Sequence, residues 1–254
     1  MSKKENKELK VSETFYSIQG EGVSMGTPSI FLRLQGCNLT CGGPTTIQSK
    51  KIENGATWRC DTIEVWKKGE ALTVDAILAQ WENNNYLNHL SQGAHLVITG
   101  GEPLLQTTEL EIFLEQLQKK LPKKGYFEIE TNGTITPTKT IDKLISHYTV
   151  SPKLANSGMS LTSRIQKNTL EWFSKKQNAY FKFVISDISD ITEIQSQLIQ
   201  PFKISSQQVY LMPACDTKDT LLKQLPKIAD LCKRNHYKLS SRLQLSIWDQ
   251  TVGV

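Results

Sequence analysis

The 254-residue sequence has no apolar stretch long enough to span a membrane, and its first ten residues lack the apolar core of a secretory signal. It has only five cysteines, an odd number that does not suit a disulfide framework. It also lacks a large charge excess, since 30 basic and 25 acidic residues leave a net charge of +5 and the lysines are scattered. We therefore expect a cytoplasmic protein without a membrane or nucleic-acid partner.

Strand and helix patterns alternate along most of the chain, which is 38% hydrophobic and long enough to bury a full core. This alternation predicts about six βα units with parallel strands, in either a barrel-like or an open doubly wound sheet. Strands are predicted at 29–34, 95–99, 126–130, 148–150, 180–185, 208–212 and 238–243. Helices are predicted near 74–81, 109–121, 141–147, 164–173, 191–199 and 221–234, and a loop is predicted at 42–55.

Chemically distinctive segments follow five of the predicted strands. In either parallel architecture, ligands bind beyond the carboxyl ends of the strands, so these segments are expected to meet at one site. They are Gly36-Cys37, Gly100-Gly101-Glu102-Pro103, Thr131-Asn132-Gly133, Ser151-Pro152-Lys153 and Met212-Pro213.

Three cysteines, Cys37, Cys41 and Cys60, are candidate ligands of an iron–sulfur cluster, because thiolates are the usual ligands of such clusters. Three thiolates leave one iron of a four-iron cluster open, and an open iron can chelate the amino and carboxylate groups of S-adenosylmethionine. Free thiols packed as small hydrophobes, or a zinc site, are the alternatives. The spacing alone leaves all of these open.

Several motifs follow one another over nearly the whole chain. They are TFYSIQGEG (14–22), FLRLQGCN (31–38), CDT (60–62), ITGGEPLLQ (98–106), ETNGT (130–134), VSPKLANSG (150–158) and YLMP (210–213). Their joint order resembles the radical S-adenosylmethionine superfamily and, within it, the 7-carboxy-7-deazaguanine synthase family. The resemblance implies an α/β fold, an incomplete, modified (βα) barrel with an inserted cluster-binding loop. It also implies a single domain over 1–254, with 1–10 as a flexible basic tail.

The cluster loop departs from the superfamily's usual C-x3-C-x2-C spacing. Pro44 stands where the third cysteine is expected, and the CDT motif assigns that role to Cys60 instead. Residues 42–59 then form an insertion between two ligands, which loop-closure entropy makes inexpensive. The resemblance thus retains three cluster ligands and leaves the conformation of the insertion open.

Other polar residues are assigned no ligand role. Cys232 lies on an apolar face of a predicted helix, where buried packing is expected. His95 and His147 fall at the edges of predicted elements. A histidine common in the family's C-terminal tail is absent, with Gln244 and Ser246 nearby.

The resemblance also implies roles for individual positions, none of them catalytic beyond the cluster ligands. Arg33 suits a carboxylated substrate because a guanidinium grips a carboxylate through two parallel hydrogen bonds, although a buried structural ion pair is its alternative. The implied substrate contacts are Ile18, Gln19, Gly20, Arg33, Thr99 and Val254. The implied magnesium contact is Thr62, and the implied S-adenosylmethionine contacts are Gly101, Ser151, Pro152, Lys153, Met212, Pro213, Ala214 and Cys215.

The activity implied by the resemblance is a carbon–nitrogen lyase reaction in queuosine precursor (preQ0) biosynthesis. It converts 6-carboxy-5,6,7,8-tetrahydropterin to 7-carboxy-7-deazaguanine with release of ammonia. The implied cofactors are a 4Fe–4S cluster, S-adenosylmethionine and Mg²⁺, with a 5′-deoxyadenosyl radical removing a hydrogen from C6 of the pterin. The implied partners are an electron donor such as flavodoxin or ferredoxin and a second copy of the chain in a homodimer.

Three other functions are compatible with parts of the pattern. Another radical enzyme, such as a glycyl-radical activase, would use the cysteines and present an exposed docking surface. A zinc-binding or nucleic-acid-binding module would use only the segment from Cys37 to Cys60. A catalytically silent homologue would account for the altered loop and tail.

Overall fold

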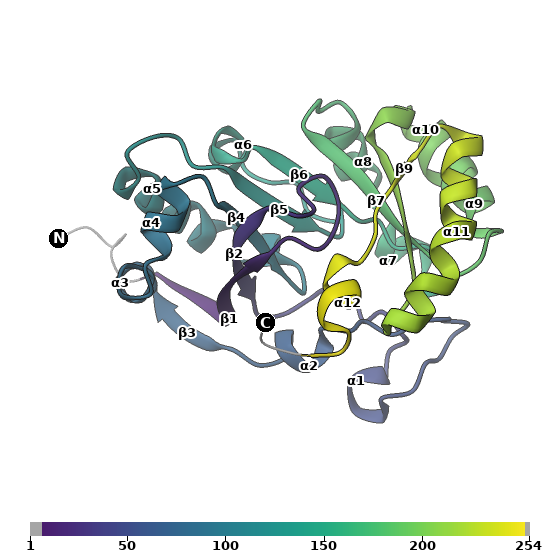
Figure 1. Ribbon diagram of the computed structural model, residues 1–254, viewed down its shortest axis with the longest axis horizontal. Helices are drawn as coiled ribbons and strands as arrows, with labels where there is room; N and C mark the ends of the chain where they lie inside the picture. Colours follow the sequence, from purple (N-terminus) through teal and green to yellow (C-terminus); the bar gives the residue numbers. More distant parts are fainter. Residues whose placement is uncertain (1–6, 252–254) are drawn as a thin grey trace.

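The computed structural model of this protein describes residues 7–251, in which nine strands form one mixed sheet in the order β3-β1-β2-β4-β5-β6-β7-β8-β9. From β2 to β9 all neighbours are parallel, whereas β1 is antiparallel to both β2 and β3. The strands are β1 (Glu8–Ile18), β2 (Pro28–Leu34), β3 (Glu70–Thr73), β4 (His95–Gly100), β5 (Phe127–Thr131), β6 (His147–Val150), β7 (Ala179–Ile185), β8 (Val209–Pro213) and β9 (Lys238–Leu239). With β3 and β9 at its two edges, the sheet is an incomplete barrel (Figure 1).

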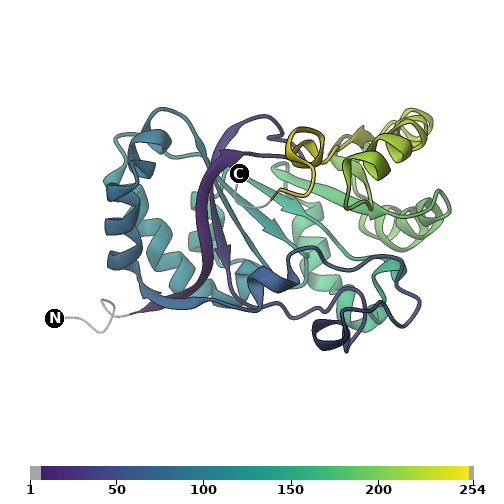
Figure 2. The ribbon, with the colours of Figure 1, turned by 60° about the horizontal axis from the view of Figure 1, so that its bottom comes forward.

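Helices cover the outer face of the curved sheet, as Figure 2 shows. The α-helices are α1 (Thr46–Ser49), α2 (Ile63–Trp66), α3 (Val74–Asn83), α4 (Tyr86–Ser91), α5 (Thr107–Lys120), α6 (Lys139–Leu144), α7 (Leu161–Arg164), α8 (Lys167–Ser174), α9 (Asp190–Glu193), α10 (Gln200–Phe202), α11 (Lys218–Asn235) and α12 (Leu243–Trp248). Four further helical segments are η1 (Pro103–Gln106), η2 (Ala155–Ser157), η3 (Ile194–Ile199, π-helical) and η4 (Ser206–Gln208). No helix in the described part of the chain is long and apolar enough to cross a membrane.

One hydrophobic core lies between the outer face of the sheet and these helices. Helix α5 illustrates how the sequence forms this core. Its apolar residues recur at helical spacing and are fully buried: Leu110, Phe113, Leu114 and Leu117. Cys232 belongs to the same core, on α11, as its apolar helical face predicted. The helices thus use their apolar faces on the sheet and leave its inner face to polar residues.

Except for β9, the parallel strands lie within a residue or two of their predicted positions, and the larger differences fall at turns and near the C-terminus. The predicted helix 141–147 ends at Leu144, and His147 begins β6. Helix 164–173 is divided into α7 and α8 because Ile165 is extended. The predicted strand 238–243 ends at Leu239, and Leu243 begins α12.

The largest difference is β1, which the sequence did not indicate as a strand. Residues 8–10 were predicted as part of a flexible tail, but they pair with β3 and open β1; residues 1–6 lie outside the described part. The alternation of β1 is interrupted midway, which hides a strand from a period-2 pattern. The loop predicted at 42–55 contains one short helix, α1.

The inner face of the sheet carries a buried polar cluster below the carboxyl ends of the strands. Glu128 of β5 is paired with His95, the first residue of β4, and its Oε2 lies 3.1 Å from His147 Nε2, at the start of β6. The hydroxyl of Tyr126 lies 3.3 Å from His147 Nδ1. Burial alone would raise the pKa of Glu128, but the hydrogen bonds from the two histidines outweigh it and lower this pKa to about 2.

This cluster predicts that the free energy of unfolding falls in acid. Because the folded-state pKa of Glu128 is depressed, its stabilisation is present above about pH 4.5 and is lost as the pH falls towards 2. The shift corresponds to about 3 kcal/mol. Urea unfolding between about pH 5 and pH 2, the window of this titration, should show a steeper loss of stability for the native chain than for Glu128→Gln. Parallel curves for the two proteins would contradict the assignment.

Candidate active site

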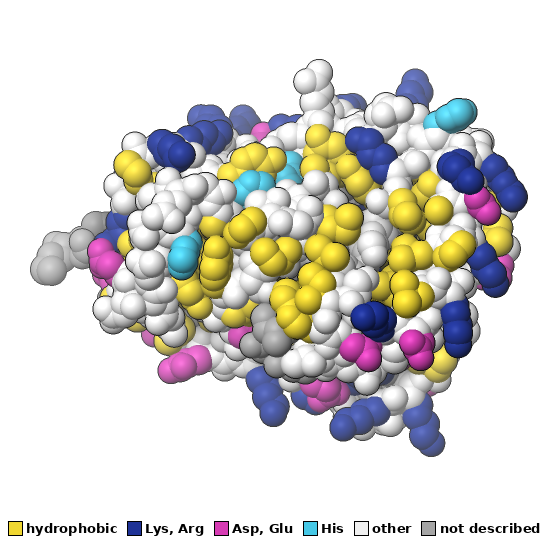
Figure 3. Space-filling view, in the orientation of Figure 1, with side chains coloured by type: hydrophobic (Ala, Val, Ile, Leu, Met, Phe, Trp, Pro, Cys, Tyr) yellow, Lys and Arg dark blue, Asp and Glu magenta, His cyan; other side chains and the backbone are white. Residues whose placement is uncertain are grey.

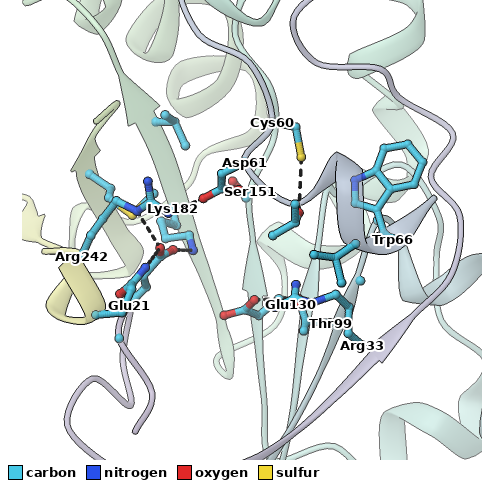
Figure 4. Close-up of a pocket in the computed structure, with 18 of the residues that line it drawn as sticks. Glu21, Arg33, Cys60, Asp61, Trp66, Thr99, Glu130, Ser151, Lys182 and Arg242 are labelled. Carbon is cyan, nitrogen blue, oxygen red and sulfur yellow. Dashed lines mark hydrogen bonds and ion pairs between the residues drawn. The ribbon is translucent and has the colours of Figure 1, made fainter. Parts of the chain in front are cut away.

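A cavity of about 750 Å³ opens at the carboxyl ends of the parallel strands and is drawn in Figure 4. It brings together segments that the sequence placed at five strand ends. The implied site residues that line it are Ile18, Gln19, Gly20, Arg33, Cys37, Cys41, Cys60, Thr62, Thr99, Gly101, Ser151, Lys153, Met212, Pro213, Ala214 and Cys215. Pro152 is not among the lining residues, and Val254 lies outside the described part of the chain.

The three cysteines of the cluster loop share this cavity although 18 residues separate the last two. The backbone N–H of Cys60 donates to the carbonyl of Cys41 at 3.1 Å, so the insertion begins and ends at one place. Burial raises the pKa of Cys37 to about 11 and that of Cys41 to about 12. Without a bound cation these two thiols are therefore protonated at neutral pH.

The insertion is anchored on the segment that follows β6. The indole N–H of Trp58 donates to Asn156 Oδ1 at 2.9 Å, and the backbone N–H of Thr57 donates to Asn156 O at 2.9 Å. At the other end of the insertion, Gly42 N–H donates to Ser157 O at 2.9 Å. The motif 150–158 thus holds both ends of the loop, which keeps Cys60 beside Cys41.

The GGEP turn that follows β4 packs directly against Cys37. A Cβ built on Gly101 would lie 2.5 Å from Cys37 Cβ and 2.2 Å from Gly36 O, so only glycine allows this approach of the GGEP turn to the cysteine. Within residues 7–251, no three Cys, His, Asp or Glu side chains are gathered closely enough to hold a single metal ion. The donor set is three thiols that line one cavity, and thiolates are the ligand type of an iron–sulfur cluster.

Thr62 and Asn132 point to these thiols. Thr62 Oγ1 lies 3.4 Å from Cys60 Sγ, and Asn132 Nδ2 lies 3.9 Å from Cys37 Sγ. The backbone N–H of Asn132 donates to the carboxylate of Glu102, which is fully buried and also accepts from the Thr131 hydroxyl. Burial raises the pKa of Glu102 to about 7 despite these hydrogen bonds. Glu102 thereby joins two of the predicted strand-end segments beneath the cysteines.

Most of the implied substrate contacts line the same cavity. Glu130 on β5 accepts from Gln19 Nε2 at 3.1 Å and from the Thr99 hydroxyl at 2.9 Å, so one carboxylate orients both side chains. Arg33 Nε donates to Glu13 Oε1 at 2.7 Å. Arg33 is thus in an ion pair, but the Glu13 side chain is 36% exposed, so this is not the buried ion pair that was the alternative for Arg33.

A charge network that the sequence did not indicate lies along the cavity (Figure 4). Glu21 accepts from Lys182 of β7, from Arg242 Nε at 3.1 Å and from Gln244 Nε2 at 2.8 Å. Arg242 also pairs with Asp61, directly after the third cysteine. Burial would raise the pKa of Glu21, but Lys182 and Arg242 outweigh it and lower this pKa far below its usual range. The network joins the β1–β2 loop, the cluster loop and the C-terminal segment.

Backbone contacts reinforce the same junction. Leu243 N–H donates to Gly20 O at 2.9 Å, and Gly22 N–H donates to Ser240 Oγ at 2.9 Å. A Cβ on Gly20 would lie 1.9 Å from Gln244 Oε1, so a side chain there would displace the Gln244 side chain from its present position. The only sequence signals for this network were Glu21 within the motif 14–22 and a lysine in the otherwise mostly apolar strand β7.

Comparison with known proteins identifies similar chains. A family model described as a 4Fe-4S single cluster domain matches residues 18–151. The 7-carboxy-7-deazaguanine synthase of Pyrobaculum aerophilum is 30% identical over 247 residues, which cover 96% of this chain and 97% of the relative. The enzyme of the same name from Halobacterium salinarum is 31% identical, over 95% of this chain and 91% of the relative.

A solved structure shares the fold. The crystal structure of QueE from Escherichia coli superposes with a TM-score of 0.61 at 24% sequence identity, covering 93% of this chain and 94% of that chain. At this identity the likeness shows the architecture alone, and that architecture is the incomplete barrel described above.

Proposed function

This chain belongs to the 7-carboxy-7-deazaguanine synthase family, and we propose that the cavity is where it converts 6-carboxy-5,6,7,8-tetrahydropterin to 7-carboxy-7-deazaguanine with release of ammonia. The observation that carries the proposal is that Cys37, Cys41 and Cys60 line the same cavity as Gln19, Arg33 and Thr99. An electron-transfer centre and a polar pocket for a small molecule would then lie a few side chains apart.

The residues that line the cavity fall into two groups with separate proposed roles. Cys37, Cys41 and Cys60 would hold the cluster, and the strand ends with Gly101, Ser151, Lys153 and Met212 to Cys215 would hold S-adenosylmethionine. When bound, these two groups supply the electron and the hydrogen-abstracting radical. Because Gly101 has no side chain, the end of β4 can lie directly against Gly36 and Cys37, which brings the proposed S-adenosylmethionine contacts beside the cluster loop.

In the group proposed to bind the substrate, Arg33 would grip the pterin carboxylate, and Glu130 would keep Gln19 and Thr99 in fixed orientations towards the ring. Thr62 would contribute its hydroxyl to a magnesium ion shared with the substrate, because a hard cation prefers oxygen ligands. The junction at Glu21 would close the cavity there and exclude water from the radical reaction.

The proposal extends to the molecule's partners. An electron donor such as flavodoxin or ferredoxin would reduce the cluster. A homodimer is supported by exposed apolar side chains, among them Tyr16, Met25, Tyr126 and Leu239, and Figure 3 shows hydrophobic side chains gathered over the middle of one face. Sedimentation of the purified chain would give the mass of a monomer if this part is wrong.

The test is anaerobic reconstitution with iron and sulfide, followed by incubation with S-adenosylmethionine, a reductant, Mg²⁺ and the carboxylated pterin. We expect 5′-deoxyadenosine and 7-carboxy-7-deazaguanine together, with a lower rate when Mg²⁺ is left out. Formation of 5′-deoxyadenosine without the deazaguanine would retain a radical enzyme and reject this substrate. Colourless protein with stoichiometric zinc and no iron would reject the cluster, and retained cluster without cleavage would favour a silent homologue.

A further inference from the structure

The side chains of β1 change face halfway along the strand. Leu9 and Val11 are buried in the core between the sheet and its helices. Glu13 and Phe15 line the cavity on the opposite face, and each pairs with a residue of β2 that also lines it. In a regular strand every second residue points to the same side, so Glu13 would share the face of Leu9 and Val11. An irregularity between Val11 and Glu13 must therefore reverse the faces.

That irregularity is a β-bulge at Ser12. Val11 pairs with Leu34 and Glu13 pairs with Arg33, its neighbour, so Ser12 is an extra residue without a partner on β2. The Ser12 hydroxyl donates to Lys68 O at 2.7 Å, which ties the bulge to the segment that follows α2. Bulges beside active sites commonly re-aim a side chain, and here the bulge turns Glu13 from the core to the cavity.

The redirected carboxylate meets the guanidinium directly opposite it. Arg33 Nε donates to Glu13 Oε1 at 2.7 Å, and this is the one hydrogen bond of the Arg33 side chain within residues 7–251. A guanidinium has a second edge, formed by its two Nη atoms, which suits a carboxylate through two parallel hydrogen bonds. Below the pair, the rings of Phe15 and Phe31 stack with centroids 4.8 Å apart and give it an apolar support.

We propose that Glu13 is a positioning residue for the substrate, held in place by the Ser12 bulge. By occupying Nε of Arg33, it fixes the guanidinium so that the two Nη atoms face the cavity and receive the pterin carboxylate. Glu13 itself does not touch the substrate. This inference rests on the proposed function, because it takes Arg33 as the residue that binds the substrate carboxylate.

The test compares Glu13→Ala with Glu13→Gln in the reconstituted enzyme. We expect Glu13→Ala to raise the KM for the carboxylated pterin and its dissociation constant about 10- to 100-fold, with kcat within about threefold of native, because a hydrogen bond to a charged group is lost. Glu13→Gln keeps an acceptor oxygen and should restore binding to within about threefold of native. A purely structural residue would not separate KM from kcat in this way.

A double-mutant cycle with Arg33→Ala distinguishes failure of the inference from failure of the proposed function. In the Arg33→Ala background, Glu13→Ala should change substrate affinity no further. If Arg33→Ala leaves affinity unchanged, the assigned role of Arg33 is wrong. If Arg33→Ala weakens binding and Glu13→Ala does not, the positioning role is wrong.

Two further variants separate an effect on substrate binding from an effect of Glu13→Ala on protein stability. Glu109→Ala breaks an ion pair with Lys7 far from the cavity and should leave KM and the melting temperature at native values. Should Glu13→Ala fail to fold, Glu13→Met fills the same volume without an acceptor and should show the same rise in KM. A Glu13→Met enzyme with native affinity would overturn the proposal.

Discussion

The substitution Cys60→Ala is expected to abolish cluster-dependent cleavage of S-adenosylmethionine. With Cys37 and Cys41 as the remaining ligands in the loop, a cubane cluster would lose one of its three protein thiolates. We expect iron and sulfide after anaerobic reconstitution to fall to about a tenth of the native content or below. The yield of 5′-deoxyadenosine should fall to background. Iron, sulfide and 5′-deoxyadenosine assays on the same preparation check this.

Two cysteines outside the loop provide the controls. Cys232→Ser should keep the cluster, because Cys232 lies in the core on α11 and away from the cavity. Cys215→Ala should also keep it, although Cys215 lines the cavity. Retained cleavage in Cys60→Ala, together with its loss in Cys215→Ala, would mean that Cys215 is the third ligand.

The substitution Glu21→Ala is expected to destabilise the protein by about 3 to 5 kcal/mol, because it leaves the buried Lys182 without its paired carboxylate and leaves Arg242 with Asp61 alone. Lys182 and Arg242 are 8% and 13% exposed, so water cannot fully replace Glu21. For a chain of this size the melting temperature should fall by roughly 10 °C. Opening the junction also admits water, so 5′-deoxyadenosine should form with little deazaguanine product. Thermal unfolding and the ratio of the two products measure both effects.

The control for this experiment is Asp230→Ala, which breaks an exposed ion pair with Lys233 on α11 and should change neither quantity. Glu21→Gln should be intermediate, because an amide oxygen can still accept hydrogen bonds while the charge is lost. A Glu21→Ala protein with native melting temperature and native product ratio would show that the junction is dispensable.

Local patterns sufficed for the parallel part of the fold. Apolar runs such as β4 and amphipathic helices such as α5 carry their own periodicity, so their positions are within a residue or two of the prediction. The predictions failed where the pattern changes within an element. Helix α6 ends at Leu144 and is followed within three residues by β6, so a continuous apolar pattern concealed the turn between them.

In the candidate site, residues within recognisable motifs were predicted, and residues outside such motifs were missed. Glycines, cysteines and strand-end motifs can be recognised in the sequence without a structure. All but two of the positions they implied line the cavity, and the exceptions are Pro152 and Val254, which lies outside the described residues. Glu13, Lys182 and Arg242 carried no motif of their own. Lys182 and Arg242 are separated by 60 positions in the chain and meet only at Glu21.

The sequence by itself determined the chemistry of this protein: three thiols, a GGEP turn and the strand-end motifs name the family and its cluster. Only the tertiary structure decided how these residues are positioned relative to one another. Cys60 lies beside Cys41 because the loop between them is anchored on Asn156. Glu13 faces Arg33 because Ser12 has no partner on β2. Residue types and short spacings are local properties, whereas loop closure and strand register depend on contacts between distant segments, which no local pattern encodes.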